Sequence, residues 1–132
     1  MDSSGTATDL QRPLFRADFR HSDEIFSGGF QPKGNNLDIY AHVHSNPEDS
    51  GFISTARTEG AARQFAADNY IDTGFIYKLR GSGIDVNARF GDASPFPYEE
   101  EIAVPGSIES HNIEGAWSIE TGEWFANPGW RQ

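Results

Sequence analysis

Short β-prone stretches recur along this chain, and glycine, aspartate or proline separates each one from the next. Stretches bounded by such turn signals are typical of strands. Because helix signals also occur between them, the sequence predicts a mixed α+β fold. The predicted strands cover residues 14–17, 51–55, 75–79, 84–86, 101–104 and 116–119.

Helix signals occur at two places in the first half of the chain. Ser22 is placed to cap a short helix that ends at a pair of glycines. Thr58 is placed to cap a second helix, in which the apolar residues of 61–66 follow the spacing of a buried face. Residues 31–50 are rich in proline, glycine and asparagine and are predicted to be mostly loop, with one helical turn around 37–44.

The chain has the size and the apolar content of one domain. It contains 132 residues, of which 36% are hydrophobic and 13% aromatic, enough for one core. Residues 1–13 are rich in serine, threonine, glycine and aspartate, a composition that does not order itself by burial. We predict a disordered tail or linker remnant at 1–13 and one folded domain at 14–132.

Charge and cysteine content exclude several functions. Ten lysine and arginine residues stand against twenty aspartate and glutamate residues, which gives a formal net charge of −10. Such a surface repels phosphate backbones and anionic lipids, so neither nucleic-acid nor membrane partners are expected. The absence of cysteine rules out disulfides and thiolate chemistry. The sequence shows neither a signal-peptide pattern nor an apolar run that could span a bilayer.

The acidic run Glu99-Glu100-Glu101 is the first candidate for chemistry. If a strand begins here, its alternation places Glu99 and Glu101 on the same face. Within a cleft, repulsion between the two charges would raise the pKa of at least one of them. A solvated acidic turn explains the same residues, and the bare pattern does not decide between these readings.

Arg16 and the pair Ser54-Thr55 are further candidates. A guanidinium binds a diphosphate or a carboxylate equally well, so Arg16 fits either a ligand or an ion pair with Asp18 that braces the sheet. The hydroxyl groups of Ser54 and Thr55 can orient a neighbouring carboxylate, but at strand ends they also satisfy local backbone groups.

His42 and His44, with Asp38 and Asp49 nearby, invite comparison with a metal site. Their spacing fits no strong zinc pattern and no third ligand set follows, so no metal is expected. One histidine that donates a hydrogen bond to a ligand fits better. The chain also has no Gly-x-Ser-x-Gly elbow and no P-loop.

Several short motifs, taken in order, closely resemble the arginine-specific mono-ADP-ribosyltransferase family of the cholera toxin and heat-labile enterotoxin catalytic subunits. The resemblance covers about residues 14–119, and it departs from the family's Ser-Thr-Ser motif where the third position is Ala56. The motifs are LFRAD at 14–18, DEI at 23–25, SGG at 27–29, PKG at 32–34, IYAH at 39–42, SGFIST at 50–55, SPFP at 94–97, EEE at 99–101 and GSI at 106–108.

The resemblance implies a split, strongly bent mixed β-sheet with flanking helices and a central cleft for NAD, which is the substrate. It implies that Glu101 holds the ribose hydroxyl and stabilises the cationic centre that forms as nicotinamide leaves. Glu99 would orient the acceptor guanidinium and help to remove its proton. No metal cofactor is implied.

The resemblance also implies a set of residues that bind NAD. Arg16 would grip the dinucleotide, the backbone of Ala17 would meet the nicotinamide amide, and His42 would line the adenylate side of the cleft. Ser54 would support the catalytic glutamate, and Thr55 would tie the two halves of the sheet together. The full set is Arg16, Ala17, Asp18, His42, Ser54 and Thr55.

The expected activity is NAD-dependent transfer of ADP-ribose to an arginine of a target protein, with release of nicotinamide. An NAD glycohydrolase, or an inactive domain that binds a nucleotide or a partner, remains open. The expected context is a monomeric toxin domain of a larger bacterial polypeptide, secreted or injected, which acts in the cytoplasm of a target cell. In bacterial competition a cognate immunity protein would be its second partner.

Overall fold

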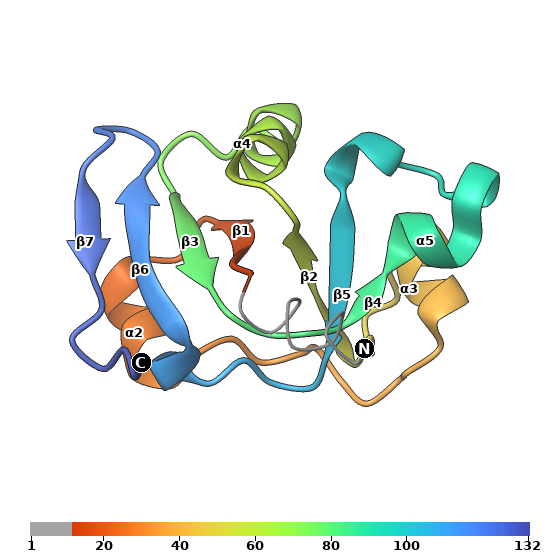
Figure 1. Cartoon of the computed structure of the whole chain (residues 1–132), viewed down its shortest axis with the longest axis horizontal. Coiled ribbons are helices and arrows are strands. Elements are labelled where there is room, and N and C mark those ends of the chain that lie inside the picture. Colours follow the sequence, from red (N-terminus) through yellow and green to blue (C-terminus); the bar gives the residue numbers. More distant parts are fainter. Residues whose placement is uncertain (1–11) are drawn as a thin grey trace, which may run out of the picture.

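The computed structural model describes residues 12–132 (Figure 1). The tail predicted at 1–13 lies almost entirely outside the described residues and stays a prediction. Seven strands form one sheet in the order β4-β5-β2-β1-β3-β6-β7. They are β1 (Leu14–Asp18), β2 (Phe52–Ala56), β3 (Phe75–Leu79), β4 (Ile84–Asp85), β5 (Glu101–Pro105), β6 (Ile113–Ser118) and β7 (Trp124–Ala126).

Short helices flank the sheet. Helix α4 packs against β1, β2 and β3 at the top of Figure 1, whereas α5 packs against β4 and β5 at its right. The helices are α2 (Ser22–Gly28), α3 (Ile39–Ser45), α4 (Glu59–Asp68) and α5 (Val86–Phe90), and the 3-10 helices are η1 (Gly91–Ala93), η2 (Pro97–Glu99) and η3 (Ser110–Asn112).

The sheet is split between β1 and β2. Within the described residues these strands share a single register pair, Phe15 with Ala56. By contrast, β1 follows β3 from Leu14 to Asp18, and β2 follows β5 along its whole length. All ladders between named strands are antiparallel, and a parallel bridge joins Asn36 to Ser50. The predicted α+β fold with a split sheet is confirmed.

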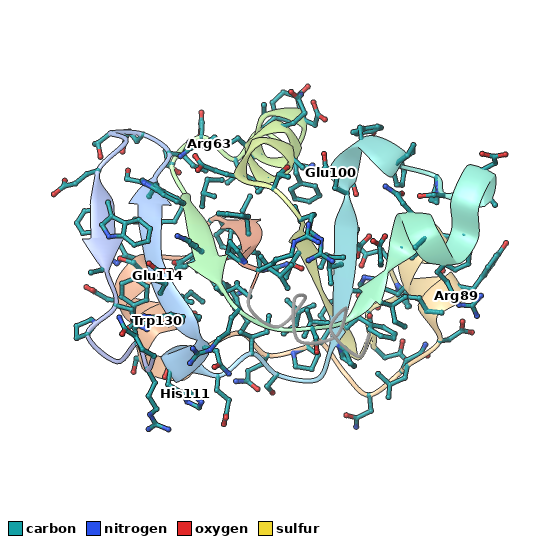
Figure 2. All side chains as sticks on the ribbon, in the orientation of Figure 1. Arg63, Arg89, Glu100, His111, Glu114 and Trp130 are labelled. Carbon is teal, nitrogen blue, oxygen red and sulfur yellow. The ribbon has the colours of Figure 1, made fainter. Side chains whose placement is uncertain are left out.

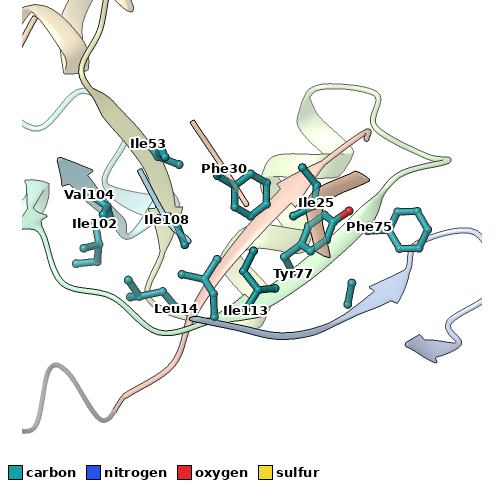
Figure 3. Packing of buried hydrophobic residues seen from close by; sticks show 12 residues of the cluster. Leu14, Ile25, Phe30, Ile53, Phe75, Tyr77, Ile102, Val104, Ile108 and Ile113 are labelled. Carbon is teal, nitrogen blue, oxygen red and sulfur yellow. The ribbon is translucent and has the colours of Figure 1, made fainter. Parts of the chain in front are cut away.

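Two of the three apolar clusters among the described residues pack on the strands beside the split in the sheet. The larger one lies on one face of the sheet and is drawn in Figure 3, with Tyr77, Phe30 and Leu14 wholly buried at its centre. The smaller one lies under α4, where Ala61, Ala62 and Ala66 pack on the strands. Small alanines let the helix approach the strands closely, beside the junction of β1 and β2.

The helix starts were partly predicted. Thr58 caps α4 as expected, because its side chain accepts a hydrogen bond from the backbone of Ala61. The assignment of Ser22 as a cap was wrong by one position. The ring of His21 accepts the hydrogen bond from the backbone of Asp23, so Ser22 is already the first residue of α2.

Three elements depart from the sequence-based expectation. The strand expected at 84–86 ends after Asp85, whose carboxylate caps α5 by accepting a hydrogen bond from Ala88. The strand expected at 116–119 begins earlier and forms β6. Strand β7 was not predicted, because its three residues are all exposed and carry no alternation.

Candidate active site

Arg16 lies at the junction where the backbone pairing of β1 and β2 ends. Its Nη1 donates a hydrogen bond to the carbonyl oxygen of Ser54 over 2.7 Å, and so links the two halves of the sheet. Its Nε donates to Oδ2 of Asp18 over 3.2 Å. Burial lowers the pKa of the guanidinium, and the charge of Asp18 opposes that effect. The side chain of Arg16 thus connects β1 to β2 where the two strands no longer pair through their backbones.

Asp18 is an anchor for two arginines. Arg20 makes a two-pronged contact with it, with Nε 2.9 Å from Oδ1 and Nη2 2.7 Å from Oδ2. Burial alone would raise the pKa of Asp18, but the hydrogen bond from Arg20 and the charge of Arg16 hold it below its ordinary value. Asp18 is 4% exposed, so its carboxylate faces the arginines.

Glu101 is the first residue of β5 and pairs with Ala56 of β2. Its Oε2 accepts a hydrogen bond from the hydroxyl of Ser54 over 2.6 Å. The same oxygen lies 2.8 Å from Nε2 of His42. Because both contacts fall on Oε2, the carboxylate is held by one oxygen, and within the described residues Oε1 has no hydrogen-bond partner.

His42 reaches Glu101 from α3, although 59 positions separate them in the sequence. Its Nε2 is also 2.9 Å from the hydroxyl of Ser54, and its Nδ1 is 2.7 Å from the hydroxyl of Ser50. The resemblance placed His42 on the adenylate side of the cleft, and Ser50 was named only as the first residue of the motif SGFIST, with no role assigned to it. The pattern of turn residues in the loop 31–50 did not indicate that Ser50 would face the ring of His42.

Glu99 ends the 3-10 helix η2, two residues before β5 begins at Glu101. The expected strand alternation through Glu99 is therefore wrong. Instead Glu100 adopts a left-handed conformation, with φ 48° and ψ 45°, and turns the chain into β5. Burial, the charge of Glu101 and the charge of Asp68 all raise the pKa of Glu99 above its ordinary value.

Two hydrogen bonds hold the turn at Glu100 in place. The hydroxyl of Thr58 donates to Oε1 of Glu100 over 3.0 Å while it also caps α4, and the backbone of Arg57 donates to the carbonyl of Glu100. Figure 2 labels Glu100 at the upper end of β5, beside α4. The turn that carries Glu99 is thus tied to the start of the helix.

A pocket opens at the β1–β2 junction. Its lining combines the two glutamates with the guanidinium of Arg16 and with apolar side chains. The lining residues are 15–17 of β1, 54–56 of β2, Ala62 and Phe65 of α4, Glu99 and Glu101. A pocket that combines apolar side chains with two carboxylates and one guanidinium suits a polar ligand that carries both charge signs.

Comparison with known proteins identifies the family. The model of the family described as Scabin-like matches residues 14–130, nearly all of the described chain. The chain belongs to the Scabin-like family. The resemblance to ADP-ribosyltransferase toxins that the sequence motifs suggested is confirmed.

Relatives of this Scabin-like chain include a named toxin. It is 32% identical to the heat-labile enterotoxin A chain of Escherichia coli over 130 residues, which cover 83% of this chain and 50% of the relative. It is 31% identical to Pierisin of Pieris brassicae over 125 residues, 86% of this chain and 15% of the relative. The chain thus spans half or less of the length of these relatives.

A solved structure gives the same picture for the fold. The Scabin toxin from Streptomyces scabies in complex with NADH superposes with a TM-score of 0.76 and 26% identity, covering 91% of this chain and 76% of that one. Other relatives are named an arginine ADP-ribosyltransferase, Chelt of Vibrio cholerae, and a guanine-specific ADP-ribosyl transferase of Streptomyces coelicolor.

The Scabin-like fold sorts the predicted site residues into two groups. Those that line the pocket are Arg16, Ala17, Ser54, Thr55, Glu99 and Glu101. Asp18 and His42 lie behind it, where they hold lining residues. Thr55 donates its hydroxyl to the carbonyl of Ile102, so it ties β2 to β5 within one half of the sheet, not across the junction as expected.

Some lining residues were missed. Phe65 and Ala62 follow the helical spacing of α4, which the sequence could assign only to a buried face. In the part of the chain from residue 12 onward, no group of three or more His, Asp or Glu side chains could hold a metal ion. No helix in that part is long and apolar enough to cross a membrane.

Proposed function

We propose that this chain cleaves the bond between nicotinamide and ribose in NAD and transfers the ADP-ribose to an arginine of a target protein. The observation that carries the proposal is the carboxylate of Glu101. Its Oε2 is held by Ser54 and His42, and the residue lines a pocket together with Arg16 and Glu99. Such a fixed charge is what cleavage of a glycosidic bond requires.

The pocket suits the nicotinamide end of NAD. Its apolar walls, which include Phe65 and Ala62, fit the faces of an aromatic ring. Beyond Phe15, the backbone of β1 has no register partner in β2, so the edge at Ala17 is left for the carboxamide. Arg16 uses two of its five N–H groups in hydrogen bonds to Ser54 and Asp18, and its Nη2 also lies 3.1 Å from Oδ2 of Asp18, so the remaining N–H groups are available for phosphate oxygens.

Bond breaking leaves positive charge on the ribose ring. Nicotinamide departs as a neutral base with the electron pair of the broken bond, and the sugar develops oxocarbenium character. A carboxylate that is already oriented stabilises this charge without reorganising during the reaction. In this proposal Oε1 of Glu101 faces the ribose hydroxyl, because Oε2 already accepts from Ser54 and His42.

The acceptor is proposed to be a guanidinium because Glu99 is a base of suitable kind and position. It lines the same pocket as Glu101, and its raised pKa makes it a better proton acceptor than an ordinary glutamate. A guanidinium nitrogen attacks the ribose carbon as the nicotinamide bond breaks. The proton it loses passes to Glu99 and then to water, so charge and atoms balance.

A guanine acceptor is the second candidate, and the observation that favours it is the name of one relative, the guanine-specific transferase of Streptomyces coelicolor. Guanine carries no positive charge, so a guanine acceptor needs no carboxylate to neutralise it before it attacks the ribose. Its binding would depend more on contacts at the edge of the pocket. The net charge of −10 disfavours a nucleic-acid polymer but not a free nucleoside.

The test supplies NAD with one acceptor at a time and measures nicotinamide release and product mass. The acceptors are a peptide with one arginine, the same peptide with lysine in its place, and deoxyguanosine. The expected result is ADP-ribose on the arginine peptide alone. Labelled deoxyguanosine would overturn the choice of acceptor. Nicotinamide release with no labelled acceptor would indicate a glycohydrolase, and no release would overturn the whole proposal.

The biological setting follows from the same proposal. The heat-labile enterotoxin A chain and the Scabin toxin are named as toxins, so we propose that this domain acts as one, as a secreted or injected effector whose target protein lies in the cytoplasm of another cell. A producing cell would then need an immunity protein that covers the pocket. Co-expression of the active chain with neighbouring open reading frames, scored by survival, tests this setting.

A further inference from the structure

Ser50 has a buried hydroxyl for which the proposed reaction has no direct use. The residue lies between α3 and β2 and is 0% exposed. Its Oγ is 2.7 Å from Nδ1 of His42 and accepts a hydrogen bond from the backbone of Phe52 over 3.2 Å. It is therefore in contact with the ring that touches Glu101, but not with the pocket itself.

The hydrogen atoms around the other ring nitrogen can be counted. The hydroxyl of Ser54 has one hydrogen, and it is donated to Oε2 of Glu101 over 2.6 Å. Both Ser54 Oγ and Glu101 Oε2 can then only accept from His42, at 2.9 Å and 2.8 Å. The hydrogen between them must belong to the ring, so Nε2 of His42 is protonated.

The same count applies at Ser50. Its oxygen already accepts from Phe52, and its own hydrogen has Nδ1 of His42 as the acceptor within reach. If Nδ1 were protonated, the hydroxyl hydrogen of a fully buried residue would have no acceptor among the described residues, which is a costly arrangement. The count therefore favours an unprotonated Nδ1.

We propose that Ser50 is a positioning residue of the site: its hydroxyl donates to Nδ1 of His42 and keeps the ring in the neutral form that carries its hydrogen on Nε2. Which nitrogen of a histidine is protonated is set by the hydrogen bond at the other one. This inference rests on the proposed function, because its benefit concerns the charge of Glu101.

The benefit is electrostatic. A neutral ring can orient Oε2 of Glu101 with one hydrogen bond and add no positive charge to the site. A charged ring at 2.8 Å would offset much of the negative charge that must stabilise the ribose cation. In this proposal Ser50 lets His42 orient the carboxylate of Glu101. At the same time it prevents His42 from neutralising the negative charge of that carboxylate.

The first test needs no variant and no activity. Nitrogen-15 NMR of the parent chain reports the protonation of each ring nitrogen of His42, with a His42→Gln spectrum to assign the signals. We expect a protonated Nε2 and an unprotonated Nδ1 at the pH of the assay. A ring protonated on Nδ1, alone or together with Nε2, would overturn the inference even if NAD is cleaved as proposed.

The second test is a double-mutant cycle on NAD hydrolysis. Ser50→Ala should lower kcat by up to about 100-fold with little change in KM, because a ring that gains positive charge offsets the charge of Glu101 that stabilises the ribose cation. In the His42→Ala background the same change should have no further effect on kcat. Ser118→Ala, which removes a buried hydroxyl on β6, is the matched control and should leave kcat unchanged.

The outcomes separate this inference from the proposed function. If Ser50→Ala lowers kcat equally with and without His42, Ser50 acts through general stability and the inference is overturned. Thermal unfolding of each variant checks that the folded fraction is the same. If the parent releases no nicotinamide, the proposed function fails, and the NMR result still decides the state of the ring.

Discussion

The two glutamates of the site stand in opposite surroundings. Glu101 starts a paired strand, and its carboxylate is 13% exposed and held by Ser54 and His42. Glu99 lies two residues earlier at the end of a 3-10 helix, next to a residue with positive φ. Within the described residues, the Glu99 side chain has no hydrogen-bond partner.

The difference separates two tasks. A carboxylate fixed by the sheet and by α3 can stabilise charge at one point without moving, which suits bond cleavage in NAD. A carboxylate on a turn that is tied to the start of α4 by one exposed side-chain hydrogen bond and one backbone hydrogen bond can change its position to suit the acceptor. If this comparison holds, changes near Glu101 should affect both cleavage and transfer, and changes near Glu99 should affect transfer alone.

The largest effect is expected for Glu101→Gln. The amide keeps the size of the side chain but removes the charge that stabilises the ribose cation. NAD hydrolysis and transfer to arginine should both fall by at least about 100-fold. Initial rates of nicotinamide release and of peptide labelling check this, with NAD binding measured by calorimetry as the control. If Glu101→Gln still transferred ADP-ribose at the parent rate, the role of the fixed Glu101 charge in both reactions would be wrong.

Glu99→Gln should separate the two reactions. Without a base for the guanidinium proton, transfer to arginine should fall by about 100-fold, whereas hydrolysis of NAD should change little. Both rates are measured on the same preparation. Equal loss of both would show that Glu99 takes part in cleavage, and the division of tasks would then be wrong.

The anchored half of the site was the more predictable one from sequence. Short motifs in chain order were sufficient to propose the strands that carry Arg16, Ser54 and Glu101, because those residues lie within or at the end of strands. The contact between Ser54 and Glu101 follows from the pairing of β2 with β5. Local patterns predict such contacts well when neighbouring strands carry both partners.

Contacts that depend on loops and short helices were not predictable. His42 meets Glu101 only because α3 folds back over β5, and no local pattern encodes that approach. The position of Glu99 depends on a left-handed Glu100, a conformation that glutamate rarely adopts and that no sequence rule assigns to it. Tertiary packing decides these positions, so a single sequence does not reveal them.

The pH dependence sharpens the comparison further. Burial, Glu101 and Asp68 raise the pKa of Glu99, so its basic form is lost at a higher pH than for an ordinary glutamate. As pH falls, transfer to arginine should therefore decline before hydrolysis does. The ratio of the two rates, followed from neutral to acidic pH, checks this, and a constant ratio would contradict it.

The same raised pKa has a consequence for stability. A carboxylate whose pKa is higher in the folded state favours folding when protonated, and this contribution is lost as pH rises through the folded value. At neutral pH the charged Glu99 thus lowers the free energy of unfolding. Glu99→Gln should raise the midpoint of urea unfolding at neutral pH, and the gain should vanish in acid.

The smallest effect is expected for Glu100→Gly. Glycine adopts the positive φ of 48° without strain, but it removes the hydrogen bond from Thr58 and adds freedom to the unfolded chain. These contributions oppose one another, each about 1 kcal/mol, so the free energy of unfolding should change little.

The turn that carries Glu99 would nevertheless be less well held in Glu100→Gly. Transfer should fall by roughly threefold and hydrolysis should not change, since a modest loss of orientation costs less than loss of the base. Glu100→Gln, which still accepts from Thr58, is the matched control and should match the parent in both rates. A parallel loss of hydrolysis in Glu100→Gly would mean that this turn also positions Glu101, and the two halves of the site would have to be regarded as one.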